Sequence, residues 1–155
     1  MQLQPEPPRF AHINRYFDAG NHRYAAKLLP GQFYLSRNEM IVTVVGTCAA
    51  VCIRDASRGL GGMNQFLEPH AATGAESSPG ENALLELVKA LLDAGAQRGY
   101  LEARVFGGAN LLADYCVVAA RTVESARLFL RHADIPVLEE DVGGRYPRKI
   151  DFCPL

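Results

Sequence analysis

A cysteine near the middle of the chain has the surroundings that a nucleophile needs. Cys48 directly follows Gly46-Thr47, at the end of an apolar run that begins at Ile41. Small neighbours leave a thiol accessible, a glycine lets the backbone bend, and the strand behind it gives support. A buried structural cysteine has the same surroundings, and it is the commoner role of this residue type. The residues alone leave both interpretations open.

The other three cysteines, Cys52, Cys116 and Cys153, lie in no paired C-x-x-C spacing. The sequence therefore predicts neither a structural zinc site nor any other metal or organic cofactor. Cys48 and Cys52 are four residues apart, which on a strand separates them by about 13 Å. A disulfide tolerates Cα atoms no more than about 7 Å apart, so reduced thiols are expected.

The first half of the chain predicts strands. Residues 41–69 form two apolar runs joined by the polar turn 55–59. Short apolar runs at residues 24–29 and 32–36 flank Pro30-Gly31, which favours a hairpin.

The second half predicts two helices among further strands. Ser78, Pro79 and Glu81 are typical of a helix start, and apolar residues follow at helical spacing as far as Gly95. Thr122 is the predicted cap of a second helix, with Val123, Ala126, Leu130 and Ala133 on its inner face. Strands are expected over residues 101–106, 135–142 and 148–153.

This order predicts an α+β fold: a mostly antiparallel two-layer β-sandwich with the two α-helices packed on one face. The layers would then run α-β-β. The 155 residues suit one domain, with residues 1–23 as an N-terminal arm and residues 24–155 as the core.

Composition excludes several classes of protein. The net charge of −1 gives no basis for binding nucleic acid or an anionic membrane. No apolar run reaches the ~20 residues that a membrane helix requires. The N-terminal residues lack the pattern of a signal peptide, so a cytoplasmic protein is expected.

Four segments carry a family resemblance: GTCAAVCIRD, GGMNQF, LEARVFGGA and EEDVGGRYPRKIDF. In this order and spacing they resemble the chemoreceptor glutamine deamidases, the CheD family, from about Lys27 to Phe152. The resemblance implies a protein-glutamine glutaminase (an amidohydrolase) that converts chemoreceptor glutamines to glutamates and releases ammonia in chemotaxis adaptation. It also implies a β-sandwich with helices on one side. The implied partners are the cytoplasmic helices of chemoreceptors and a CheC-type phosphatase.

The resemblance also implies a site. The family's cysteine nucleophile follows G-S/T-C, which falls on Cys48, and its threonine falls on Thr43 or on the position of Val42. The family's histidine is the last residue of G-G-M-N-H, where this chain has Gln65. The predicted substrate-binding or oxyanion residues are Gly46, Thr47, Gly61, Gly62 and Asn64. Gly107 and Gly108 are candidates for lining the same cleft.

Gln65 changes the expected chemistry, because an amide can donate a hydrogen bond but cannot transfer a proton. General acid–base help contributes roughly two to four orders of magnitude in rate. The alternative to a deamidase is therefore a weakly active or inactive homologue that binds receptor helices or a CheC-type phosphatase. His70, five residues further on, is the nearest substitute, although a straight strand would point it to the opposite face.

Overall fold

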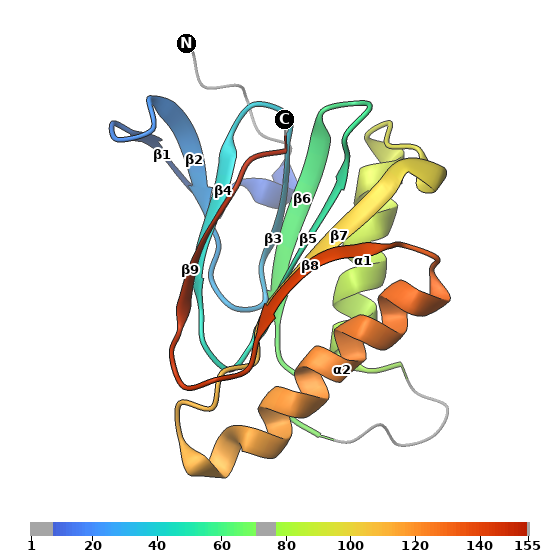
Figure 1. Ribbon diagram of the computed structural model, residues 1–155. Coiled ribbons are helices and arrows are strands. Elements are labelled where there is room, and N and C mark those ends of the chain that lie inside the picture. Colours follow the sequence, from blue (N-terminus) through green and yellow to red (C-terminus); the bar gives the residue numbers. More distant parts are fainter. Residues whose placement is uncertain (1–7, 71–76, 155) are drawn as a thin grey trace.

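The computed structural model describes residues 8–70 and 77–154. In this part of the chain nine strands form two mixed sheets, and two α-helices cover the outer face of one of them (Figure 1). The predicted α+β sandwich with helices on one face is confirmed. Residues 71–76 of the loop expected before the first helix lie outside the described residues.

The four-stranded sheet has the order β1-β2-β4-β9. Its pairs are antiparallel except for β2 and β4. Its strands are β1 (Asn14–Asp18), β2 (Arg23–Lys27), β4 (Met40–Val45) and β9 (Arg148–Phe152).

The five-stranded sheet has the order β3-β6-β5-β7-β8, and only β7 and β8 pair in parallel. Its strands are β3 (Phe33–Ser36), β5 (Ala49–Asp55), β6 (Leu60–Phe66), β7 (Leu101–Gly107) and β8 (Val137–Val142). The central strand β5 is buried on both faces because the other sheet covers one face and the helices cover the other. The edge strand β8 is exposed, and its acidic residues suit an unpaired edge.

The helices are α1 (Pro79–Asp93) and α2 (Cys116–His132), with short 3₁₀ turns at Pro8–Phe10, Arg98–Tyr100 and Ala113–Tyr115. The predicted start of α1 is confirmed: the Ser78 side chain accepts a hydrogen bond from the Glu81 N–H at 3.1 Å. Leu84, Leu87 and Leu91 of α1 are buried against the five-stranded sheet. The predicted capping role of Thr122 is wrong. Thr122 lies inside α2, where its hydroxyl donates to the Val118 carbonyl.

Two strand predictions need correction. The hairpin expected around Pro30-Gly31 does not form, because β2 and β3 belong to different sheets. The apolar run beginning at Ile41 is likewise not one strand: β4 ends at Val45 in the four-stranded sheet, and β5 begins at Ala49 in the other. The chain therefore crosses from one layer to the other at residues 46–48. The pairing of β5 with β6 across the turn 55–59 is as predicted.

Candidate active site

The crossing between the sheets holds Cys48 in a bend. The bend is fastened to the segment after β7: Gly108 N–H donates to the Cys48 carbonyl at 2.9 Å, and Ala109 N–H donates to the Gly46 carbonyl at 2.9 Å. The Thr47 hydroxyl donates to the Ala109 carbonyl at 3.2 Å. Cys48 is half-buried, so its thiol is supported and still reachable.

Gly107 makes this close fastening possible. Its φ of 111° lies in the region that favours glycine, and a Cβ there would overlap the Cys48 carbonyl oxygen. The Gly107-Gly108 pair, at the end of β7, was predicted to line the cleft with Cys48. The structure gives Gly107 a supporting role, because it lets the β7 end pass directly against the Cys48 backbone.

Gln65 and Thr43 are brought together across the sandwich. Gln65 lies on β6 and Thr43 on β4, so they belong to different sheets. The Gln65 Nε2 donates to Thr43 Oγ1 at 2.6 Å, and both side chains are buried. The Val42 side chain clusters with Ala25 and Met40, away from the cluster between the sheets, and the match of the family's threonine to Thr43 stays a prediction.

Cys48 and Gln65 line one cavity of about 510 Å³. Its other walls are the turn at residues 30–33, the end of β6 and the first half of α1. Among the described residues that line it, Glu86 is the one charged side chain, and it is an anion. Burial raises the pKa of the Cys48 thiol above its ordinary value, and no cation among the described wall residues opposes this.

No histidine contributes to the described wall of this cavity. His70 follows the end of β6 and is exposed, as are His12, His22 and His132. The structure therefore does not bring His70 to Cys48 as a substitute for the family's histidine.

The remaining predicted residues fall into two groups. Gly46 and Thr47 are in the bend with Cys48. Gly61 and Gly62 lie earlier on β6 and outside the described cavity wall, where a Cβ would collide with Arg54 and Leu35 respectively. Their predicted role as oxyanion donors stays a prediction.

Asn64 lines the cavity from the other face of β6, since successive side chains of a strand alternate. Its side chain is 1% exposed. Neither its Oδ1 nor its Nδ2 has a hydrogen-bond partner in the described part of the chain. A buried polar group left unpaired in this way is uncommon and requires an explanation. Asn64 stays a predicted substrate-binding residue.

Sequence reasoning missed an apolar surface beside the bend. Leu111 and Leu112, which follow the segment that fastens Cys48, are 45% and 62% exposed. Leu111 lies against Gly46, where a Cβ would overlap its side chain. Two adjacent leucines after a glycine pair were the available signal, and exposed apolar side chains in a group are typical of a contact surface.

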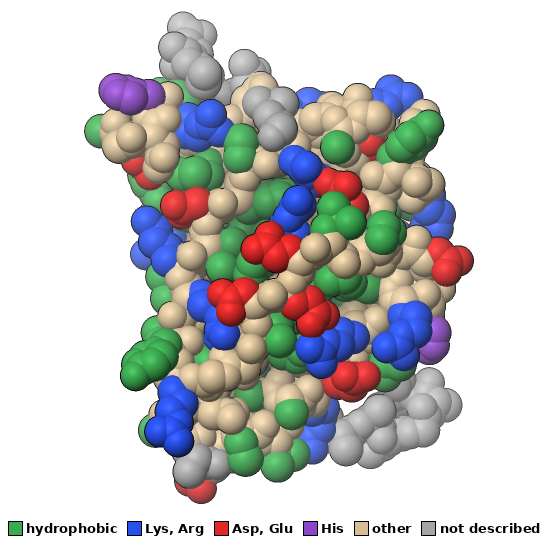
Figure 2. All heavy atoms as spheres, in the orientation of Figure 1, with side chains coloured by type: hydrophobic (Ala, Val, Ile, Leu, Met, Phe, Trp, Pro, Cys, Tyr) green, Lys and Arg blue, Asp and Glu red, His purple; other side chains and the backbone are tan. Residues whose placement is uncertain are grey.

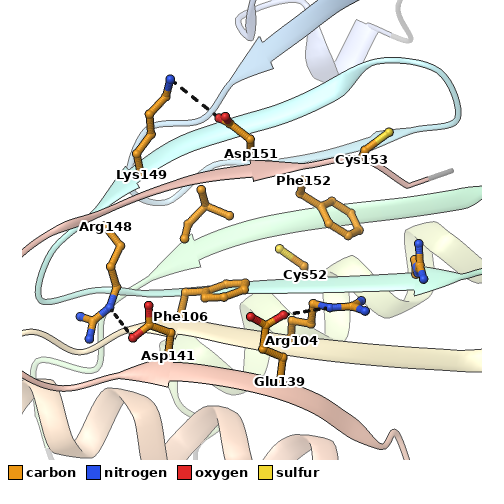
Figure 3. A pocket seen from close by; sticks show the side chains of 12 residues that line it. Cys52, Arg104, Phe106, Glu139, Asp141, Arg148, Lys149, Asp151, Phe152 and Cys153 are labelled. Atoms are coloured by element: carbon orange, nitrogen blue, oxygen red, sulfur yellow. Dashed lines mark ion pairs between the residues drawn. The ribbon is translucent and has the colours of Figure 1, made fainter. Parts of the chain in front are cut away.

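A second hollow, of about 590 Å³, lies between the edge strands β8 and β9 (Figure 3). Its charged side chains pair with one another, as in Arg148–Asp141 at 3.1 Å and Arg104–Glu139 at 3.3 Å. Figure 2 shows both signs of charge interspersed over this face of the molecule, without a large area of either sign.

Cys52 and Cys153 line this second hollow and are separate from Cys48. Burial raises the pKa of the Cys52 thiol.

Comparison with known proteins identifies relatives that match most of this chain. The family described as CheD chemotactic sensory transduction matches residues 67–155. The probable chemoreceptor glutamine deamidase CheD of Halorhodospira halophila is 40% identical, with 95% of this chain and 73% of the relative covered. The protein of the same description from Saccharophagus degradans is 40% identical, with 96% and 74% covered. The probable chemoreceptor glutamine deamidase CheD 1 of Dechloromonas aromatica is 43% identical, with 91% and 74% covered.

Proposed function

The chain belongs to the CheD family, and from that premise we propose that it deamidates glutamine side chains of chemoreceptors with Cys48 as the nucleophile. The observation that carries the assignment of Cys48 is its place in the bend between the sheets. It is half-buried, is fastened by hydrogen bonds from the β7 end, and opens into a cavity that it shares with Gln65. Neither α1 nor α2, the two α-helices among the described residues, has the length and apolar character of a membrane span.

The proposed reaction has two steps. The Cys48 sulfur attacks the carboxamide carbon of the target glutamine, and the thiol proton leaves with the NH₂ group as ammonia. The resulting thioester is hydrolysed by water, which gives the glutamate side chain and restores the thiol. The attack also needs N–H donors for the oxyanion, and the predicted donors in the bend are the backbone groups at Gly46 and Thr47.

The proposed substrate contact extends over the apolar surface beside Cys48. Leu111 and Leu112 are exposed next to the bend, which suits docking of the apolar side of a receptor helix. The cavity receives the target glutamine, and the leucines hold the surrounding helix.

Ammonia release from a cytoplasmic chemoreceptor fragment tests this function. The wild type should convert glutamine to glutamate in the fragment, which mass spectrometry detects, and Cys48→Ala should not. Cys116→Ala is the matched control because Cys116 is exposed and lies outside the cavity. Equal ammonia release by wild type and Cys48→Ala would exclude Cys48 as the nucleophile.

A binding module is the second proposed function, and one observation favours it. Burial raises the pKa of Cys48, and no described cationic side chain lines its cavity to stabilise the thiolate. Such a homologue would bind receptor helices or a CheC-type phosphatase without turnover. Saturable binding of the receptor fragment without any ammonia release would support this alternative.

A further inference from the structure

Both N–H groups of the Gln65 side chain are engaged inside the protein. Nε2 donates to Thr43 Oγ1 at 2.6 Å and to the Val44 carbonyl at 3.4 Å. The Thr43 hydroxyl donates its own proton to the Leu28 carbonyl at 2.9 Å, so its oxygen faces Gln65 as an acceptor. A flipped carboxamide would place Oε1 against two acceptors. The surroundings therefore fix which end of the Gln65 amide faces the protein.

Among the described residues, none donates a hydrogen bond to the Gln65 Oε1, although the residue is only 2% exposed. Unlike the two side-chain polar atoms of Asn64, this oxygen is not fully enclosed by the protein. Because Gln65 lines the cavity that Cys48 opens into, its oxygen is an acceptor held in place at the site.

A fixed acceptor distinguishes the substrate of a deamidase from its product. The carboxamide of glutamine carries two N–H donors, whereas the carboxylate of glutamate carries none at neutral pH. We propose that Gln65 Oε1 accepts a hydrogen bond from the NH₂ group of the target glutamine, and so makes this site bind glutamine in preference to glutamate. This inference deepens the proposed function and rests on it. Gln65 is thus a substrate-binding residue in place of a proton-transfer residue.

The expected preference is about tenfold, because bound glutamine makes one neutral hydrogen bond to the Gln65 oxygen, whereas bound glutamate would place a carboxylate against that oxygen. The selectivity also has a kinetic consequence. Product that carries glutamate in place of glutamine should leave the site readily and inhibit weakly.

The binding experiment uses the full chain with Cys48→Ala, which prevents turnover. Its ligands are a cytoplasmic chemoreceptor fragment with its glutamines intact and the same fragment with these glutamines replaced by glutamate. We expect about tenfold tighter binding of the glutamine form. Adding Gln65→Met, which keeps the length of the side chain and removes its amide, should abolish the preference. Gln97→Met is the matched control, since Gln97 is exposed and outside the cavity wall.

A second variant addresses the fixed orientation of the amide. Thr43→Val removes the acceptor that holds Nε2, so Gln65 can turn either end toward the ligand and the preference should fall. In the enzyme with Cys48 intact, Gln65→Met should raise KM by more than it changes kcat. Circular dichroism and thermal unfolding verify that each variant is folded. If Gln65→Met does not fold, the Thr43→Val result decides the question.

The outcomes separate this inference from the proposed function. Ammonia release with equal binding of the two fragments would overturn the inference and leave the deamidase function standing. Preferential binding of the glutamine form without ammonia release would support the inference and contradict the deamidase function. Preference that survives both Gln65→Met and Thr43→Val would overturn the role of Gln65.

Discussion

Restoring a histidine at position 65 should increase the rate of deamidation. The Thr43 hydroxyl donates to the Leu28 carbonyl, so its oxygen can only accept from residue 65. A histidine in Gln65→His would donate one ring N–H to this oxygen and keep its second nitrogen for the cavity that Cys48 opens into. The imidazole would then take the thiol proton and return it to the departing ammonia.

The size of the effect follows from two quantities. An unperturbed cysteine with a pKa of ~8.5 is only a few per cent thiolate at neutral pH. Burial raises the pKa of Cys48, so its thiolate fraction is smaller still. General acid–base catalysis contributes at least about 100-fold in rate, or about 2.7 kcal/mol. We therefore expect Gln65→His to raise kcat/KM by about this lower value.

The assay is ammonia release from a receptor fragment, measured as kcat/KM across the neutral pH range. In parallel, the alkylation rate of Cys48 as a function of pH reports its pKa, which should fall in Gln65→His. Gln97→His is the control, because it adds the same side chain at an exposed position. If Gln65→His is folded and its deamidation rate and Cys48 alkylation rate are both unchanged, the inference that residue 65 faces Cys48 is refuted. A wild type as fast as an active family member would mean that a residue other than residue 65 supplies the proton.

Three further changes test the architecture around the site. Among single cysteine-to-alanine variants, only Cys48→Ala should abolish ammonia release while thermal stability is kept; loss of activity in a folded Cys116→Ala instead would contradict the assignment. Gly107→Ala should destabilise the protein by on the order of 1–3 kcal/mol and reduce activity, because a Cβ there strains the backbone and displaces Cys48, whereas an unchanged melting temperature would exclude this packing. Burial alone would raise the pKa of Asp55, but hydrogen bonds from Ser57 and the Gln97 N–H outweigh it and hold the pKa below its usual value. This carboxylate therefore stabilises the fold above the unfolded-state pKa of ~3.9, and the stabilisation is lost as pH falls through the folded-state pKa. In Asp55→Asn, the free energy of unfolding measured with urea should decrease less on acidification than in the wild type, and an equal decrease would contradict the prediction.

Local signals in the sequence were sufficient for the elements that local chemistry defines. Ser78 and Pro79 predicted the start of α1, and the polar turn 55–59 predicted the pairing of β5 with β6. Capping and turn residues act within a few positions along the chain, so their patterns are readable without the fold.

The sequence did not predict in the same way which strands belong to which sheet. Residues 41–53 contain no charged residue and no proline, and the Gly46-Thr47 pair alone does not distinguish a crossing between sheets from a bend within one strand. Apolar runs report burial and do not report which strand lies alongside. The hairpin predicted around Pro30-Gly31 failed for this reason. Thr122 has the residue type of a cap, but its hydroxyl bonds back inside a helix that starts six residues earlier.

The candidate site was predictable only as far as its residue types. The family resemblance indicated Cys48, Gln65 and either Thr43 or Val42, and the structure brings Gln65 to Thr43 and to the cavity of Cys48. The direction of the Gln65 amide depends on two carbonyls: that of Leu28 accepts the Thr43 hydroxyl proton, and that of Val44 accepts from Gln65 Nε2. No spacing along the chain encodes that contact.

The hydrogen bond between Gln65 and Thr43 joins the two layers of the sandwich, so the geometry of the site depends on the distance between the layers. Met63 and Phe152 pack in the cluster that separates the sheets, and neither lines the cavity of Cys48. A change of side-chain volume at either position would alter the distance between the sheets and with it the aim of the Gln65 oxygen. We therefore expect activity to respond to substitutions at core residues that lie outside the cavity wall, although such substitutions alter no group at the site.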